Sequence, residues 1–255
     1  MQTTDKISFR YINKLAVPAI IAGIAEPLLS ITDTAIVGNV NINPIESLAA
    51  VGIAGSFIAA LVWILSQTRS AISAIIAQHL GAKKLNEISD LPAQIIFINI
   101  ILSLVIYITT VFFITFIFKL YNAEGLILDY AVDYYKIRAL GFPLTLFVFS
   151  VFGIFRGMQN TFWPMVISIT GALLNVVLDF VLVYGIEGII PAYHTKGAAY
   201  ASVIAQLVMA LMALVLMLKK TPFSLRLQLP FNKELKRLIS LSFNFIFIIT
   251  NTSFH

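Results

Sequence analysis

The feature that most constrains this chain is a succession of long apolar segments separated by short polar connections. A helix that crosses a membrane needs about 20 consecutive apolar residues. The chain is 59% hydrophobic and only 11% charged, whereas soluble domains are roughly 25% charged. The segments lack the alternating pattern of an outer-membrane barrel, so we expect an all-α membrane protein. The predicted spans are residues 15–38, 48–78, 93–118, 137–155, 162–184 and 197–218, with a seventh opening near residue 238.

The second of these segments is longer than one straight crossing requires. It has 31 residues, and each residue of an α-helix adds about 1.5 Å to its length. The apolar core of a bilayer is about 30 Å thick. We therefore expect this helix to be tilted or to extend beyond the membrane.

Composition excludes several classes of function. There is no Cys, and the three His residues (His79, His194 and His255) are scattered, so we expect no disulfide framework and no zinc or redox cofactor. The formal net charge is +5. The basic residues lie in short loops between apolar segments, where they indicate membrane topology rather than binding of nucleic acid. Neither a His/Glu metal motif nor a Ser/His pair lies within the spans, so we do not expect an enzyme.

Basic residues predict the orientation of the chain in the membrane. The connections that share a side with the N-terminus carry twelve of them, and those on the opposite side carry four. Cytoplasmic loops are enriched in Lys and Arg, so the N-terminus is predicted to be cytoplasmic. Arg69 lies within a span. The first set is Lys6, Arg10, Lys14, Lys83, Lys84, Arg156, Lys219, Lys220, Arg226, Lys233, Lys236 and Arg237, and the second is Lys119, Lys136, Arg138 and Lys196.

Two spans carry acids where a membrane helix rarely has them. Asp33 and Asp179 lie 18 and 17 residues into the first and fifth spans, about 26 Å along helices that both run outward. Glu26 is seven residues before Asp33, close to two full turns, and Asn175 is four residues before Asp179. If these faces turn inward, the four side chains line one polar cleft in the outer half of the membrane.

A carboxylate near the middle of a membrane helix costs roughly 2.5 to 3.5 kcal/mol, so such acids usually face a cavity and bind or relay something. Burial favours the neutral form of a carboxyl group, which would allow proton exchange near neutral pH. Alternatively, Asp33, Asn175 and Asp179 offer hard oxygen ligands to Na⁺. The sequence leaves both the H⁺ and the Na⁺ interpretation open, and no other metal site is expected.

Structural roles for the same residues are also open. Asp33 or Asp179 could be hydrogen-bonded to Thr32, Thr34 or Tyr184, or paired with Arg69. Arg69 itself is better explained as such a partner, or as an interfacial side chain, than as a substrate ligand. Glu26 precedes Pro27 and could satisfy backbone amides around a kink. Pro18 and Pro27 are predicted kink positions, through which bending of the first helix could gate the cleft.

Six stretches of this sequence, in order, resemble the multidrug and toxic compound extrusion (MATE) transporters, in the DNA-damage-inducible protein F (DinF) branch. Six motifs in register make chance similarity implausible, and they cover nearly the whole chain. They are "PLLSITDTAIVG" (27–38), "RSAISAIIAQHLG" (69–81), "YYKIRALGFP" (134–143), "RGMQNTFWP" (156–164), "NVVLDFVLVYG" (175–185) and "KGAAYASVIA" (196–205).

The resemblance implies a function and a site. Family members are secondary antiporters that expel organic cations and other amphiphilic drugs in exchange for H⁺ or Na⁺. By position, Asp33, Asn175 and Asp179 match the family's cation-coupling site, with Glu26 on the same face, and Pro18 matches a proline associated with bending of the first helix. Two departures suggest a cation preference of its own: Glu26 stands where Gln or an apolar residue is expected, and "LFVF" (146–149) lacks a polar side chain.

The resemblance also implies a domain organisation. The family has twelve helices in two six-helix lobes, and this chain matches the N-terminal lobe. We expect residues 1–218 to form that lobe, 219–237 a cytoplasmic linker and 238–255 the start of a seventh helix in an incomplete C-terminal lobe. Residues 233–254 repeat the layout of residues 6–28, a basic lead-in followed by an apolar span.

The sequence is also compatible with other functions. A flippase of the same wider exporter group would carry a lipid-linked substrate, and a more basic cleft would favour it. An inactive half-transporter, a non-transporting membrane scaffold or an intramembrane enzyme are further alternatives. The expected location is the bacterial inner membrane, with a small amphiphilic or cationic molecule, the lipid bilayer and the missing lobe as partners. The substrate and the oligomeric state stay unknown.

Overall fold

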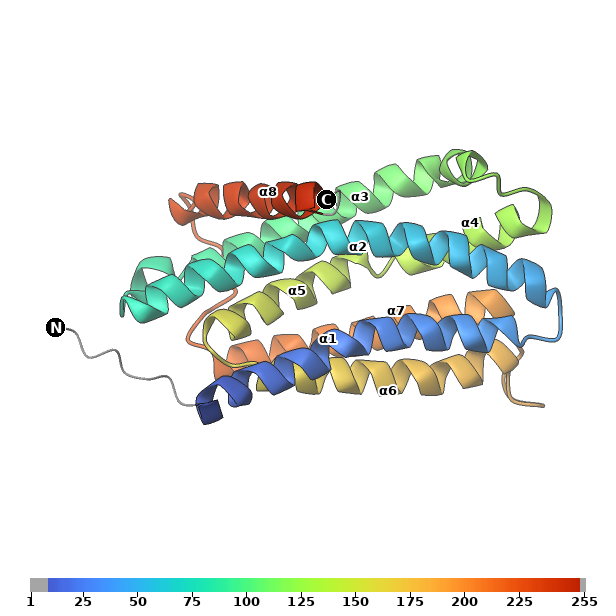
Figure 1. Cartoon of the computed structure of the whole chain (residues 1–255), viewed down its shortest axis with the longest axis horizontal. Coiled ribbons are helices and arrows are strands. Elements are labelled where there is room, and N and C mark those ends of the chain that lie inside the picture. Colours follow the sequence, from blue (N-terminus) through green and yellow to red (C-terminus); the bar gives the residue numbers. More distant parts are fainter. Residues whose placement is uncertain (1–8, 253–255) are drawn as a thin grey trace.

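The computed structural model describes residues 9–252, without the side chains of residues 11, 26, 27, 29, 30, 243 and 245–252. The described chain is helical except for its connections and one isolated bridge between Ile186 and Ile190. The long helices run along one common axis (Figure 1), which confirms the all-α expectation. They are α1 (Phe9–Gly38), α2 (Pro44–Gly81), the short 3-10 helix η1 (Leu85–Ile88), α3 (Leu91–Leu120), α4 (Gly125–Ala139), α5 (Phe142–Gly157), α6 (Phe162–Tyr184), α7 (His194–Lys220) and α8 (Glu234–Thr252).

Most of these helices are long and apolar enough to cross a membrane. Four spans meet that condition singly, Pro44–Gly81, Leu85–Leu120, Phe162–Tyr184 and His194–Lys220, and the bent pair α4–α5 makes a fifth. In α1 the apolar stretch among residues with described side chains is Ile12–Ala25. Helix α2 has 38 residues and is therefore about 57 Å long, so it extends beyond a single bilayer core, as its sequence predicted.

The fourth predicted span was wrong in its bounds. Instead of one helix over 137–155, the chain forms α4 and α5. The second helix is bent by 47° from the direction of the first. Pro143 in the first turn of α5 has no backbone N–H and clashes with the carbonyl four residues earlier, so α4 ends at Ala139. Helix α4 was missed because it carries two Asp and two basic residues within 15 positions, which lowers its hydropathy.

The apolar interior forms two clusters, one at each end of the bundle. We call the end that carries residues 221–233 the linker end, and the opposite one the far end. The linker-end cluster joins α2, α3, α5, α6, α7 and the start of α8, with Ile72, Ile76, Phe152, Phe155 and Met217 among its buried members. The far-end cluster joins α1 to α4, α6 and α7, with Val37, Ala54, Phe118, Tyr135 and Val183 among its members.

Glycines set the closest helix contacts in the bundle. A Cβ added at Gly153 or Gly157 of α5 would collide with α2, at Ile72 and Ile76 respectively and at the α2 backbone. A Cβ at Gly197 of α7 would meet the backbone of α6 at Leu182. Small residues let membrane helices approach closely and gain packing contacts. The α2–α5 and α6–α7 pairs are therefore fixed by backbone proximity.

Hydrogen bonds tie the linker to the α2–α3 connection. The Gln94 side chain donates to the Gln228 carbonyl at 2.9 Å and accepts from the Asn232 backbone N–H at 2.8 Å. The amide of Asn232 also donates to Asp90 at 2.8 Å. The non-helical linker, 221–233, is shorter at both ends than the predicted 219–237. It is held in place rather than loosely joined.

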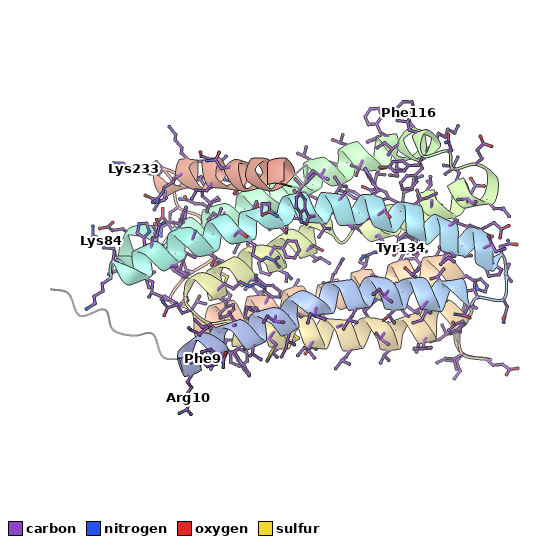
Figure 2. All side chains as sticks on the ribbon, viewed as in Figure 1. Phe9, Arg10, Lys84, Phe116, Tyr134 and Lys233 are labelled. Atoms are coloured by element: carbon purple, nitrogen blue, oxygen red, sulfur yellow. The ribbon has the colours of Figure 1, made fainter. Side chains whose placement is uncertain are left out.

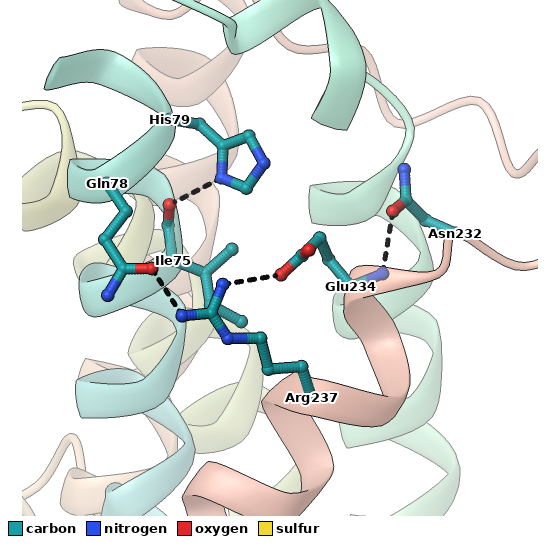
Figure 3. A network of polar contacts seen from close by, with 6 residues as sticks. All are labelled: Ile75, Gln78, His79, Asn232, Glu234 and Arg237. Atoms are coloured by element: carbon teal, nitrogen blue, oxygen red, sulfur yellow. Dashed lines mark hydrogen bonds and ion pairs between the residues drawn. The ribbon is translucent and has the colours of Figure 1, made fainter. Parts of the chain in front are cut away.

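The first turn of α8 continues this network onto α2. The Arg237 guanidinium donates to Gln78 Oε1 at 2.7 Å and pairs with Glu234 at 3.2 Å (Figure 3). The backbone N–H of Glu234 donates to Asn232 Oδ1 at 3.0 Å. Helix α8 then runs beside α2.

Candidate functional site

The acids of the first and fifth predicted spans meet inside the bundle. Asp33 lies five residues before the end of α1, and Asp179 five residues before the end of α6, so both stand at one level in the far-end half. Helix α1 packs on α6 and also touches α7. Asp33, Asn175 and Asp179 are 5%, 2% and 0% exposed. The structure thus brings together three of the four residues predicted for one cleft.

Asn175 and Ser202 connect α6 and α7 to Asp33. The amide orientation that satisfies both Asn175 atoms has its nitrogen donating to Asp33 Oδ1 at 3.0 Å and its oxygen accepting from the Ser202 backbone N–H at 3.2 Å. The Ser202 hydroxyl donates to the other oxygen of Asp33 at 3.4 Å. Both oxygens of Asp33 therefore have donors. Ser202 had no role in the sequence prediction, although it lies in the helix whose motif includes residues 196–205.

Asp179 has a different environment. Neither of its carboxyl oxygens has a hydrogen-bond donor among the described residues, although the group is fully buried. Its carboxyl group lies within interaction range of that of Asp33. Ionised carboxylates are acceptors only, so the two groups can bond to each other only through a shared proton or a cation. A buried pair of this kind is costly without such an ion.

A cavity of about 520 Å³ opens beside these residues. Asp33, Asn175 and Ser202 form part of its wall, and Asp179 is not among its lining residues. Its apolar and aromatic lining includes Trp63, Phe142, Phe149, Phe152 and Met209. Two basic residues, Arg69 and Arg138, also line it. A mostly apolar hollow with few polar groups is the usual form of a small-molecule site.

Arg138 was misplaced by the sequence prediction. It was counted with the outer connections, which left Arg69 as the single cation expected within a span. In the structure Arg138 stands on the last turn of α4, at the break before α5, and acts electrostatically on Asp33 and Asp179. Its guanidinium is also within interaction range of the hydroxyl of Tyr134, one helical turn earlier. The unrecognised helix α4 hid this residue, whose only signal was an arginine just before a Gly-Phe-Pro break.

The other residues predicted for the site are Arg69, the two prolines of α1 and Glu26. Arg69 lies over the ring of Phe149, 4.9 Å from its centroid, and lines the cavity. Helix α1 continues through Pro18 and Pro27 without interruption, so their role in bending stays a prediction. The side chains of Glu26 and Pro27 lie outside the described residues.

Two of the structural alternatives for Asp33, hydrogen bonds from Thr32 and from Tyr184, are replaced by other contacts. The hydroxyl of Thr32 donates to the Leu28 carbonyl at 2.9 Å, and that of Tyr184 donates to the Ile36 carbonyl at 2.9 Å. Neither of these hydroxyls donates to Asp33. Among the described residues, no group of three His, Cys, Asp or Glu could hold a metal ion.

Comparisons with known proteins agree with this architecture. The MatE family model matches residues 18–181. The chain is 27% identical over 205 residues to DNA damage-inducible protein F of Escherichia coli, which covers 80% of this chain and 43% of that protein. It is 26% identical over 216 residues to a probable multidrug resistance protein NorM of Thermotoga maritima, covering 84% and 45%. The chain thus spans less than half the length of these relatives.

Solved structures share the fold. A crystal structure of MATE in the bent conformation superposes with a TM-score of 0.83 at 24% identity, over 92% of this chain and 51% of that one. An outward-facing conformation of a multidrug resistance MATE family transporter gives 0.81 at 23% identity, over 92% and 52%. The six-helix lobe with the start of a seventh helix is therefore about half of that architecture.

Proposed function

Because the chain belongs to the MatE family, we propose that it is the N-terminal part of a secondary active transporter that exports amphiphilic or cationic drugs in exchange for H⁺ or Na⁺. The multidrug resistance proteins among its relatives support drug extrusion. The observation that carries the exchange is the pair of buried carboxyl groups, Asp33 and Asp179, next to the cavity. Such a pair takes up a cation when the membrane gradient supplies one and releases it on the other side.

The site chemistry fits either ion. A proton between Asp33 and Asp179 would give Asp179 the hydrogen-bond partner that the described residues do not supply. For Na⁺, the two carboxylates supply oxygens, and Asn175 can turn its amide so that its oxygen faces the ion. In its present orientation Asn175 presents the nitrogen to Asp33. The Asn175 amide can therefore donate its N–H to an ionised Asp33, or turn its oxygen toward a cation bound between the two acids.

The cavity accounts for the type of substrate. Its aromatic and aliphatic side chains suit an apolar body, and its polar and charged side chains, Asp33 among them, suit a substrate that also carries a polar or cationic group. A substrate held against Asp33 would respond to the charge of that residue. Binding of the coupling cation and of a cationic drug would then exclude each other, which is what exchange requires.

We place the linker end in the cytoplasm of a bacterial cell whose inner membrane holds the protein. Arg10, Lys84 and Lys233 lie at this one end of the bundle (Figure 2), as the positive-inside rule requires of a cytoplasmic side. Cysteines introduced at Lys84 and Lys233 should resist an impermeant thiol reagent in intact cells, and one at Glu187 should react. The reverse labelling would invert the topology.

A flippase for a lipid-linked substrate is the second candidate. Two arginines line the cavity instead of the one expected from sequence, and basic residues suit the phosphates of such lipids. Replacing Arg69, which lines the cavity outside the Asp33, Asp179 and Arg138 cluster, with Gln should weaken flipping of an anionic lipid but spare the efflux of a cationic dye.

The central test uses vesicles from cells that express the whole reading frame. Asp33→Asn keeps the size and hydrogen bonds of the side chain but can neither release a proton nor neutralise Na⁺. It should abolish dye efflux driven by a proton or Na⁺ gradient, as should Asp179→Asn, whereas Asn175→Ala should weaken it. Glu26→Gln should retain partial activity.

The matched control is Asp129→Asn, the same substitution on the exposed surface of α4, which should leave efflux unchanged. Expression and membrane insertion are measured for every variant. If a normally expressed Asp33→Asn protein pumps at the parental rate under both gradients, the exchange role of Asp33 is wrong.

A further inference from the structure

The charged groups around the buried acids suggest how many cations the site can hold. Asp33 and Asp179 carry two negative charges when ionised. Arg138, on the last turn of α4, lines the same cavity as Asp33 and is a positive group close enough to act electrostatically on both acids. Because a buried cluster in a membrane is stable only when its charges are nearly balanced, one arginine leaves the equivalent of one negative charge to be neutralised.

We propose that Arg138 is a resident counter-ion that limits the Asp33–Asp179 site to one monovalent cation per cycle. This inference rests on the proposed exchange function and extends it. Arg138 is a positioning residue in this scheme, because it acts through the two acids. The geometry that supports it is the α4–α5 break, which ends α4 one residue after Arg138 and turns this side chain into the cavity that Asp33 also lines.

The contacts of Arg138 hold it at this place without neutralising it. It lies within interaction range of Tyr134, a buried phenol without charge, and its Nε has no hydrogen-bond partner among the described residues. Gln206 of α7 lines the same part of the cavity and packs against Gly141 in the α4–α5 break, where a Cβ would collide with it. The break is thus fixed from the α7 side, and the arginine with it.

The other charged groups nearby are assigned elsewhere. Arg69 lines the cavity from α2, but it lies over Phe149, and the charged groups that act on Asp33 are Asp179 and Arg138. Lys196 of α7 is paired with Asp133 of α4 at 3.0 Å, on the exposed rim. Glu26 belongs to the same helix as Asp33 and its side chain lies outside the described residues. The charge balance at the buried acids therefore involves Asp33, Asp179 and Arg138.

Counting protons tests the charge balance directly. The protein, purified in lipid nanodiscs in Na⁺-free medium, is titrated potentiometrically between about pH 11 and pH 5, a range that covers the protonation of strongly buried carboxyl groups. Uptake is compared with that of the Asp33→Asn variant, so that the same His residues and surface groups cancel. The native chain should take up one proton more than Asp33→Asn, in which Asp179 stays ionised beside Arg138.

Two further variants separate a counter-ion from a structural arginine. Arg138→Met should take up two protons more than Asp33→Asn, and should bind the first about tenfold or more tightly because a nearby positive charge is gone. The double variant Asp33→Asn/Arg138→Met should regain the single proton that Asp33→Asn alone lacks. Arg138→Lys should match the native chain. A purely structural role would predict no such rescue.

Each outcome has one meaning. If the native chain and Asp33→Asn take up equal numbers of protons, Asp33 binds no cation and the proposed exchange function fails. If the native chain gains one proton but the double variant does not recover it, Arg138 is not the counter-ion and only the present inference fails. Should Arg138→Met not fold, the double variant, whose cluster keeps the native charge balance, decides the question.

Discussion

The contact between α2 and α5 at the linker end and the meeting of α1, α6 and α7 in the far-end half use buried space in opposite ways. At the first, Gly153 and Gly157 press α5 against Ile72 and Ile76, and the surrounding cluster is aliphatic and aromatic. At the second, Asp33 and Asp179 lie side by side with too few donors for both. The first region is dominated by close apolar packing, and the second contains two buried acids without enough hydrogen-bond donors for both.

The difference follows from what each region can gain. In a membrane the lipid tails are as apolar as the protein, so association of helices depends on close packing and on hydrogen bonds. The α2–α5 contact obtains this through its glycines. The acid pair adds little stability, because burying two carboxyl groups costs free energy. Such a cost is typical of sites that must bind and release an ion. The α2–α5 contact therefore contributes stability, whereas the acid pair is better explained by the proposed exchange.

The largest expected effect is on the packed side. Gly157→Leu would drive a side chain into Ile76 and the Ser73 carbonyl, and overpacking against a backbone should lower the free energy of unfolding by about 3 kcal/mol. The unfolding midpoint in detergent, followed by fluorescence and size exclusion, measures it. Gly52→Ala is the matched control, since a Cβ there meets nothing within 4 Å. A Gly157→Leu protein as stable as this control would show that the contact is not close-packed.

A smaller effect of opposite sign is expected on the charged side. Asp179→Asn removes one of two adjacent buried charges, so in a cation-free medium at alkaline pH it should raise the free energy of unfolding by about 1–2 kcal/mol. The same unfolding assay reads it. Asp133→Asn, which breaks the exposed pair with Lys196, should change stability little. If Asp179→Asn were instead destabilising, the acids would contribute to the fold and the contrast between the two regions would fail.

The smallest expected effect on stability comes from a hydrogen bond in the closely packed region, between α3 and α5. Asn99 of α3 is buried and donates to Ser150 of α5 at 2.7 Å. Hydrogen bonds between membrane helices are worth about 0.6 kcal/mol on average and up to about 1.7. Asn99→Ala should therefore destabilise by about 1 kcal/mol and leave proton uptake by the acids unchanged. A change in proton uptake would mean that the two regions are coupled.

The sequence predicted the helical bundle and the convergence of Asp33, Asn175 and Asp179, because helix periodicity and the depth along a span are local properties. It missed what depends on contacts between distant segments. Ser202 has no distinguishing neighbours in sequence and becomes a partner of Asp33 only when α7 packs on α1 and α6. Arg138 was assigned to a loop because the hydropathy of α4 is low, and only the break before Pro143 turns it inward.

The linker described above also has a mechanical consequence. Asn232 is bonded to Asp90, Arg237 to Gln78, and Leu238 is buried in the linker-end cluster. The first turn of α8 is therefore joined to the ends of α2 and α3. If this lobe moves against a second one, a pivot farther along the chain than Leu238 would leave these contacts intact, whereas a pivot in the loop would break them. Force transmitted from a second lobe would then arrive at α2, whose length of about 57 Å makes it the longest lever arm among the described helices.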